Sequence, residues 1–393
     1  MPARPRLVLL ASCVPMLLAL LVTLPAPAKA AGSSDWKQVS TGAAHSCGIR
    51  VSGRLYCWGD DELGQLGDGE VRSAQFTPVQ VAGGGSWVQV SAGYLHTCAV
   101  RSTGAMYCWG DDSIGQLGDG SAGSGVGVPQ LVAGSITDWR SVSAGEAFNC
   151  AVRSVGRLYC WGGDIDGELG NGASRRDRAT PGQVTGKRTD WKQVSAGQNH
   201  ACALRTTGRL YCWGANAGRL GNGGVDPSGV PVPVAGGRTD WASVDTGSSH
   251  TCALRTSGRL YCWGGDSLGQ LGDGASGGSR LTPGQVIGGA RDWSRVTLGG
   301  LHTCAVKTSG RAYCWGVDVY GELGDGDPLA ASAQPSQLVG GATDWRIIDS
   351  SGNSRHTCAT TSARRLYCWG ANSRGQLGNG TLTQSSEPVE ARS

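Results

Sequence analysis

The sequence lacks features that many enzymes and helical proteins carry. It has only three methionines beside 66 glycines and 14 tryptophans, which indicates many tight turns between short strands and little helix after residue 31. No glycine-rich phosphate loop leads from a strand into a helix, and the glycines recur instead as turn residues of the repeat. The acidic loops at 164–168 and 325–327 do not fit a full calcium-loop pattern. We therefore predict no enzyme activity, no cofactor and no metal site.

An excess of charge of one sign is also missing. Without the first thirty residues, which hold Arg4, Arg6 and Lys29, 31 basic residues stand against 30 acidic ones. No run of Lys or Arg remains that could act as a basic arm on a phosphate backbone. We therefore expect no nucleic acid partner.

The first thirty residues have the pattern of an export signal. Arg4 and Arg6 precede an apolar run over 7–24, and the small residues Ala28 and Ala30 suit a signal peptidase. This pattern predicts a signal peptide at residues 1–30, cleavage after Ala30, and a secreted or cell-envelope protein.

Two other interpretations of this segment stay open. Residues 10–13 end in Cys13 and resemble a lipoprotein box, and an uncleaved apolar run could just span a bilayer although Pro15 interrupts it. The protein would be attached to a membrane only in these two cases. Export is common to all three interpretations.

What the chain has in abundance is an internal repeat. Seven times it follows the frame D-W-x-x-V-S-A-G-x-x-H-T-C-A-L-R-T-S-G-R-L-Y-C-W-G-x-x-x-x-G-Q-L-G-x-G, at intervals of 50 to 54 residues. A fixed period of this length predicts one closed array of similar units and not several domains. We predict a single domain over 31–393, with repeats that begin near 36, 87, 139, 191, 241, 293 and 345.

Two cysteines stand ten positions apart in every repeat. In the first repeat, the runs 46–50 and 54–58 alternate apolar and polar residues and are joined by 51–53, which predicts a hairpin. A three-residue loop that ends in a left-handed Gly53 places Cys47 opposite Cys57. If the two arginines beside the loop form a hydrogen-bonded pair, the cysteines form a non-hydrogen-bonded pair with α-carbons about 4.5 Å apart, which suits a disulfide.

The same register applies to all seven cysteine pairs. Zinc sites usually combine C-x2-4-C knuckles into four ligands, whereas each of these pairs is complete in itself. We therefore predict seven disulfides with a stabilising role: Cys47–Cys57, Cys98–Cys108, Cys150–Cys160, Cys202–Cys212, Cys252–Cys262, Cys304–Cys314 and Cys358–Cys368.

Each repeat offers four strands. They run through W-x-x-V-S, H-T-C-A-L-R, R-L-Y-C-W and a short segment near P-x-x-V, such as 78–81. Four antiparallel strands repeated seven times predict an all-β, seven-bladed propeller. At one per blade, the frame histidines are expected to hydrogen-bond the backbone of their own repeat, and the two frame tryptophans to pack between blades.

These motifs resemble the regulator-of-chromosome-condensation repeat family. The elements G-x-x-H-T, G-x-x-Y-x-W-G and G-Q-L-G stand at 93–97, 104–110 and 115–118, and the resemblance extends over about residues 36 to 390. It implies a seven-bladed propeller but leaves function open, because the family includes exchange factors, light sensors, ubiquitin-ligase modules and secreted inhibitors. The tryptophans that the family's ultraviolet-B sensor carries before the histidine are absent here, for example at 43–44 and 248–249.

Three repeats depart from the frame, which usually marks loops or blade closure. The third repeat has Phe148 and Asn149 where the others have His-Thr, the fourth loses one residue within 215–219, and the seventh gains two within 349–355.

The variable positions predict one binding face. The residues before each histidine and the loops after each W-G emerge at the same edge of the strands. The predicted binding residues are Tyr94, Leu95, Glu146, Phe148, Asp60, Asp61, Asp112, Asp164, Asp166, Leu301, Tyr320 and Arg355. At the opposite edge, arginines beside the hairpin turns are expected to pair with the aspartates that precede the frame tryptophans.

We thus predict an exported, monomeric propeller that binds a protein partner through its acidic, irregular face, with Tyr94, Leu95 and Leu301 as apolar anchors. Alternatives are a secreted enzyme inhibitor, a carbohydrate-binding or polysaccharide-degrading protein and, least favoured, a guanine-nucleotide exchange factor. Asn379 heads a glycosylation sequon that is used only if the host glycosylates exported chains.

Overall fold

The computed structural model describes residue 1 and residues 35–327 and 331–392. The chain divides into two units, Met1–Ala31 and Gly32–Ser393. The predicted signal peptide, its cleavage site and Cys13 lie outside the described residues, so the fold below is that of the second unit.

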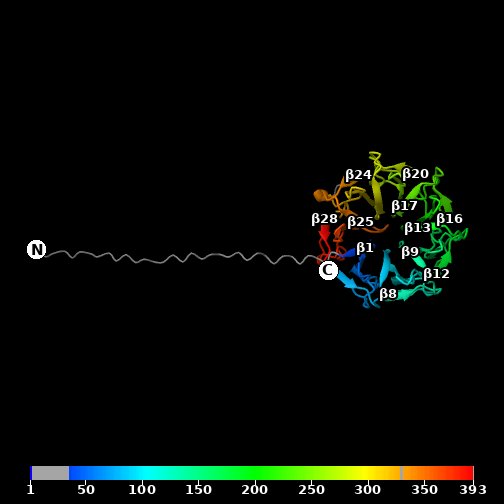
Figure 1. Ribbon diagram of the computed structural model, residues 1–393, viewed down its shortest axis with the longest axis horizontal. Coiled ribbons are helices and arrows are strands. Elements are labelled where there is room, and N and C mark those ends of the chain that lie inside the picture. The colour runs from blue at the N-terminus through cyan, green and yellow to red at the C-terminus, as the bar shows by residue number, and fades with distance from the viewer. Residues whose placement is uncertain (2–34, 328–330, 393) are drawn as a thin grey trace. The chain divides into compact units, whose positions relative to one another are not determined.

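The second unit is an all-β propeller of seven four-stranded antiparallel sheets arranged in a ring (Figure 1). Blade 1 consists of β1 (Trp36–Thr41), β2 (His45–Arg50), β3 (Leu55–Asp60) and β4 (Ala74–Gln80). Blade 2 consists of β5 (Trp87–Ala92), β6 (His96–Arg101), β7 (Met106–Asp112) and β8 (Gly123–Leu131). Blade 3 consists of β9 (Trp139–Ala144), β10 (Phe148–Arg153), β11 (Leu158–Gly162) and β12 (Arg178–Gln183).

The other four blades repeat this order. Blade 4 consists of β13 (Trp191–Ala196), β14 (His200–Arg205), β15 (Leu210–Gly214) and β16 (Ser228–Pro233). Blade 5 consists of β17 (Trp241–Thr246), β18 (His250–Arg255), β19 (Leu260–Gly265) and β20 (Ser279–Gln285). Blade 6 consists of β21 (Trp293–Leu298), β22 (His302–Lys307), β23 (Ala312–Gly316) and β24 (Ser332–Gln337), and blade 7 of β25 (Trp345–Asp349), β26 (His356–Thr361), β27 (Leu366–Gly370) and β28 (Ser385–Glu390).

The fold class predicted from the repeat is confirmed, with one difference in the fourth strand. Each blade runs from an inner first strand to an outer fourth strand (Figure 1). The fourth strand is longer than the P-x-x-V segment: β4 begins at Ala74, because its upstream residues pair with the end of β3 at Gly59 and Asp60. The only helical turn in the described ranges is the 3-10 turn η1 (Val339–Gly341), and they contain no helix long and apolar enough to cross a bilayer.

The predicted hairpin register is confirmed. Cys47 pairs with Cys57, the Arg50 amide donates to the Arg54 carbonyl, and Gly53 has a φ of 81°. A left-handed residue is needed there, and glycine adopts that conformation without strain. All seven predicted disulfides form between the second and third strands, with α-carbons 4.0 to 4.1 Å apart.

The hydrophobic core lies between blades. One cluster joins Ile49 and Leu55 of blade 1 to Val90 and Trp109 of blade 2, and six similar clusters fill the other junctions. The frame tryptophans are 0 to 7% exposed, which confirms that they pack between blades. The ring closes in the same way: blade 7 is built from consecutive strands and its β25 and β26 pack against β1 of blade 1. Among the described strands, none is exchanged between the first and last blades, so closure there rests on packing and hydrogen bonds.

Candidate functional site: the loop-face basin

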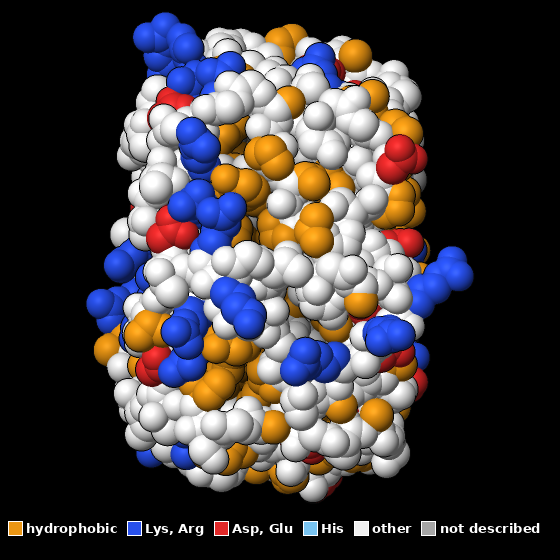
Figure 2. All heavy atoms as spheres, turned by 90° about the vertical axis from the view of Figure 1, so that its right-hand side faces the viewer, with side chains coloured by type: hydrophobic (Ala, Val, Ile, Leu, Met, Phe, Trp, Pro, Cys, Tyr) orange, Lys and Arg blue, Asp and Glu red, His pale blue; other side chains and the backbone are white. Residues whose placement is uncertain are grey.

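The turns between first and second strands and the loops between third and fourth strands share one side of the ring, which we call the loop face. The hairpin turns between second and third strands lie on the other side, which we call the hairpin face. Figure 2 views the propeller from its rim and shows the Lys and Arg side chains gathered mainly toward one of these two sides. On this part of the rim, the cationic side chains are therefore unevenly distributed between the two faces.

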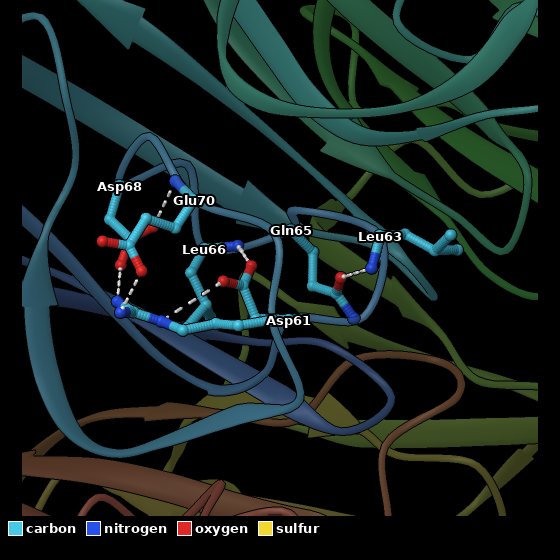
Figure 3. A network of polar contacts seen from close by, with 7 residues as sticks. Asp61, Leu63, Gln65, Leu66, Asp68 and Glu70 are labelled. Atoms are coloured by element: carbon cyan, nitrogen blue, oxygen red, sulfur yellow. Dashed lines mark hydrogen bonds and ion pairs between the residues drawn. The ribbon is translucent and has the colours of Figure 1, made fainter.

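The acids that follow W-G are mostly structural. Asp61 is fully buried and its Oδ1 accepts a hydrogen bond from the Leu66 amide at 3.0 Å, while Gln65 accepts one from the Leu63 amide (Figure 3). Because burial disfavours its charged form, the pKa of Asp61 is raised to about 7. The same bond to a leucine amide is made in the other blades by Asp112, Asp164, Asn216, Asp266, Asp318 and Asn372.

Because these carboxylates are buried in hydrogen bonds of their own loops, the prediction that they form an acidic binding face is wrong for several of them. Asp60, Asp61, Asp112 and Asp164 are only 0 to 6% exposed, because the G-Q-L-G loop folds over them. Phe148 is 2% exposed and belongs to the core between blades 3 and 4. These five side chains do not reach the surface where a partner would bind.

A cavity of about 750 Å³ occupies the loop face, and we call it the loop-face basin. Every blade contributes a residue from the segment before its second strand: Ala43, Tyr94, Glu146, Gln198, Ser248, Gly300 and Asn353. Loops of blades 5 and 6 add a largely apolar side: Leu268, Val317, Val319 and Tyr320. The basin therefore combines positions that are far apart in the sequence.

Five of the predicted binding residues come together in this basin: Tyr94, Glu146, Leu301, Tyr320 and Arg355. Tyr94 is 40% exposed. Leu95 and Asp166 are half-buried and lie outside the basin lining.

Blades 5 and 6 contribute basin residues that the sequence did not single out. Leu268 and Val319 are 37% and 52% exposed, so they offer apolar area to the cavity. Glu322 replaces the glutamine of G-Q-L-G and accepts a hydrogen bond from the Tyr320 amide at 2.7 Å. Burial raises the pKa of Glu322 to about 7. Its departure from the G-Q-L-G frame was the sequence signal that could have marked it.

One wall of the basin is fixed by an arginine and a tyrosine. Arg355 Nη1 donates to the Tyr320 hydroxyl at 3.1 Å, and its guanidinium lies 5.4 Å from the centre of the tyrosine ring. The contact joins blade 7 to blade 6 and holds the Tyr320 ring in place.

The two-residue insertion in the seventh repeat forms the floor of the basin. The Ser351 amide donates to Thr41 Oγ1 in blade 1 at 2.9 Å, and Asn353 and Ser354 line the cavity. Gly352 approaches so closely that an added β-carbon would lie 3.1 Å from both the Gly197 α-carbon and the Thr246 carbonyl oxygen. A loop of blade 7 thus reaches blades 4 and 5, and it separates the basin from the central channel below.

The Nε2 atoms of the frame histidines bond to side chains of the next blade and not to the backbone of their own repeat, which corrects that prediction. His45 Nε2 lies 2.9 Å from Thr97 Oγ1, and Thr97 Oγ1 donates to the Gln65 carbonyl at 2.9 Å. The hydroxyl has one hydrogen, so His45 must donate from Nε2. Burial lowers the pKa of His45 to about 3, which agrees with a neutral ring. His96, His200, His250, His302 and His356 bond to the following blade in the same way.

The irregular third repeat follows from this pairing. Asn149 serves both roles of the missing threonine: its Oδ1 accepts from His96 and its Nδ2 donates to the Gln116 carbonyl. Phe148 replaces the histidine, and the residue that would have been its partner in blade 4 is Ala201. The two changes match, so neither leaves a buried polar group without a partner.

The arginines beside the hairpin turns pair locally, as predicted. Arg50 with Asp35, Arg153 with Asp138, Arg205 with Asp190, Arg255 with Asp240 and Lys307 with Asp292 form ion pairs on the hairpin face. In the described part of the chain, no three His, Cys, Asp or Glu side chains converge as metal ligands.

Comparison with known proteins agrees with this architecture. The model of the RCC1-like domain matches residues 88–392, and models of the regulator of chromosome condensation (RCC1) repeat match 36–65 and 52–100. The chain belongs to the RCC1-repeat family. The ultraviolet-B receptor UVR8 of Arabidopsis thaliana is 32% identical over 360 residues, which cover 90% of this chain and 69% of the receptor.

Other RCC1-repeat relatives share less with this chain. The human E3 ubiquitin-protein ligase HERC2 is 28% identical over 86% of the chain, which spans only 7% of that ligase. Human WBSCR16 superposes with a TM-score of 0.77 at 22% identity, covering 86% of this chain and 94% of that structure. Yeast RCC1 (Prp20), in its complex with Kap60, superposes with a TM-score of 0.76 at 20% identity. The match covers 88% of this chain and 85% of that structure. At these identities the two structures show the shared fold.

Proposed function

We propose that this RCC1-repeat propeller is an exported, non-enzymatic interaction module that binds another protein through the loop-face basin. The observation that carries the proposal is the basin itself, a cavity of about 750 Å³ to which all seven blades contribute. Frame positions are used for bonds between blades, whereas the basin residues differ from blade to blade. Variation on a rigid scaffold is the usual way in which a repeat fold acquires a specific partner.

The basin has the composition of a protein-binding surface. Tyr94, Leu301 and Tyr320 supply aromatic and apolar area, while Glu146 and Arg355 supply charge at its edge. Binding energy at protein interfaces is concentrated in a few such anchors that are surrounded by polar groups. Enzyme inhibition is a more specific form of this function.

The test is capture of a partner from extracellular and envelope fractions of the host, with protein lacking residues 1–30 as bait. The basin variant carries Tyr94→Ala, Leu301→Ala and Tyr320→Ala. The matched control carries Val128→Ala, Leu131→Ala and Val230→Ala, which remove exposed apolar side chains from the outer strands β8 and β16.

A protein retained by the native chain and the control but not by the basin variant would support the proposal. Retention by all three would place the binding site elsewhere. Retention by none would contradict a protein partner and favour a carbohydrate ligand. If the captured protein is an enzyme, its rate with and without the propeller distinguishes an inhibitor from a passive binder.

A further inference from the structure

The central channel forms a second cavity, separate from the basin. It has a volume of about 350 Å³ and is lined by inner strands of blades 1 to 4 together with Asp245 of blade 5 and Asp349 of blade 7. No residue of the blade 7 loop that floors the basin belongs to its lining among the described residues. Volumes of this size are typical of small-molecule sites.

A ring of side-chain oxygens surrounds the channel. In each blade, the fifth residue of the inner strand accepts a hydrogen bond from a backbone amide of the next blade, as Ser40 does from Ala92 at 3.1 Å. The other six acceptors are Ser91, Ser143, Ser195, Asp245, Thr297 and Asp349, at 2.8 to 3.1 Å. The ring is complete, including the junction between Asp349 and Thr41 that closes the propeller.

Some of these groups keep hydrogen-bonding capacity for a ligand. Ser40, Ser91 and Ser143 use an oxygen lone pair in the ring, and within the described residues their hydroxyl hydrogens have no acceptor. A hydroxyl has one donor besides its lone pairs. Across the channel, Asp245 and Asp349 supply carboxylate oxygens. One half of the channel wall therefore offers donors and the other half offers acceptors.

The channel is open toward the hairpin face, where cations lie at its mouth. Arg140 and Lys192 follow the tryptophans that begin β9 and β13, and both side chains are exposed. Arg140 Nη2 donates to the backbone carbonyls of Trp191 and Lys192, which holds it beside the neighbouring blade. Across the described chain, neither Arg140 nor Lys192 has a carboxylate oxygen within 4.0 Å, whereas Arg153, Arg205 and Arg255 of this face are each paired with an aspartate.

We infer that the channel binds an acidic saccharide, with a carboxylate of the sugar at Arg140 and Lys192 and its hydroxyl groups against Ser40, Ser91, Ser143, Asp245 and Asp349. Sugar hydroxyls both donate and accept, which suits a wall with donors on one side and carboxylates on the other. The cations at the mouth select a sugar acid over a neutral sugar, since charge-assisted bonds to a carboxylate are the stronger ones.

The inference is tested by titrating protein lacking residues 1–30 with trigalacturonate, maltotriose and inorganic phosphate, by calorimetry and by amide chemical shifts. We expect trigalacturonate to bind, with maltotriose and phosphate at least about tenfold weaker. The shifted amides should include those of Ala92 and Ala144, whose acceptors line the channel.

Two double variants distinguish binding in the channel from nonspecific attraction between the anionic sugar and the positive charge of this face. Arg140→Met with Lys192→Met should weaken trigalacturonate binding by at least about tenfold. Arg157→Met with Arg209→Met is the control, because it removes the same charge from exposed sites on the same face. It should change the affinity for trigalacturonate by less than about twofold. Ser91→Thr adds one methyl group to the channel while it keeps the acceptor, as Thr297 does naturally, and should weaken binding without lowering the melting temperature.

Several results would overturn the inference. They are no binding of trigalacturonate, equal binding of phosphate, or equal losses in the two double variants. Loss of trigalacturonate binding in the basin variant would assign the sugar to the loop face instead. Because the two sites lie in separate cavities, failure here leaves the protein-binding proposal unaffected, and the reverse also holds.

Discussion

At the residue scale, the pairing between histidine and threonine shows how repeats are joined. The His45 ring donates to Thr97, and Thr97 donates to the Gln65 carbonyl, which also accepts from Trp109 Nε1 at 3.0 Å. Every member of this chain of bonds is fully buried. A substitution in one blade therefore affects the hydrogen bonds of the next blade. Phe148 and Ala201 are a natural example, because both the histidine of blade 3 and its threonine partner in blade 4 are replaced.

Thr97→Ala should destabilise the protein by about 1 to 3 kcal/mol, because it leaves the buried His45 Nε2–H without an acceptor. His45→Phe added to Thr97→Ala should restore part of this loss, since it reproduces the pair Phe148 and Ala201. The measurement is a double-mutant cycle from urea unfolding, with an expected coupling of about 1 kcal/mol. Strict additivity of the two changes would contradict the pairing.

Asp349 provides a test of pH dependence. Burial raises its pKa in the folded state to about 7, so folding favours the protonated form and the stability from this group is lost as the pH rises from about 4 to about 7. Asp349→Asn should therefore stabilise the protein at pH 8, by up to about 3 kcal/mol, and have little effect near pH 4. The measurement is the free energy of unfolding at both pH values.

The matched control for Asp349 is Asp138, whose pKa shifts in the opposite direction. Burial alone would raise it, but hydrogen bonds from Arg153 and Ser154 lower the pKa of Asp138 overall. Asp138→Asn should therefore be neutral or destabilising at pH 8. Stabilisation at pH 8 by both substitutions, or by neither, would contradict the raised pKa of Asp349 and the lowered pKa of Asp138.

At the scale of the blade, the hairpin was predictable because its turn and its cysteines are local. The alternation over 46–50 and 54–58 and the position of Gly53 fix the register without any knowledge of the neighbouring blades. What the sequence could not show is contact between repeats. The histidine partners and the burial of Asp61 under the G-Q-L-G loop depend on how repeats fold over one another, which a single repeat does not reveal.

The disulfides belong to this scale as well. Cys98→Ala with Cys108→Ala should lower the free energy of unfolding by about 2 to 3 kcal/mol, since the bridge closes a short loop of the unfolded chain. Blade 2 should still form, because its hairpin register and its core with blade 1 do not need the bond. Melting temperatures and a circular dichroism spectrum test this. Complete unfolding of the variant at 25 °C would contradict a role limited to stability.

At the scale of the whole molecule, the residues of the repeat frame and the variable residues have different structural roles. Frame residues join each blade to the next, including the closure between blades 7 and 1, while variable residues converge in the basin. The loop face itself was predictable from strand direction, because both variable segments emerge at one edge. Its floor was not: the sequence shows that the seventh repeat has two extra residues but not that they reach Gly197 and Thr246 across the ring.

The central claim, that a protein partner docks in the loop-face basin, is tested most directly by site-specific photo-crosslinking. A benzophenone amino acid is placed at Tyr94 in the basin in one variant and at Arg157 on the hairpin face in another. With extracellular and envelope fractions of the host, we predict a discrete adduct at position 94 and none at position 157. An adduct at position 157 alone, or the same adduct at both positions, would contradict the account.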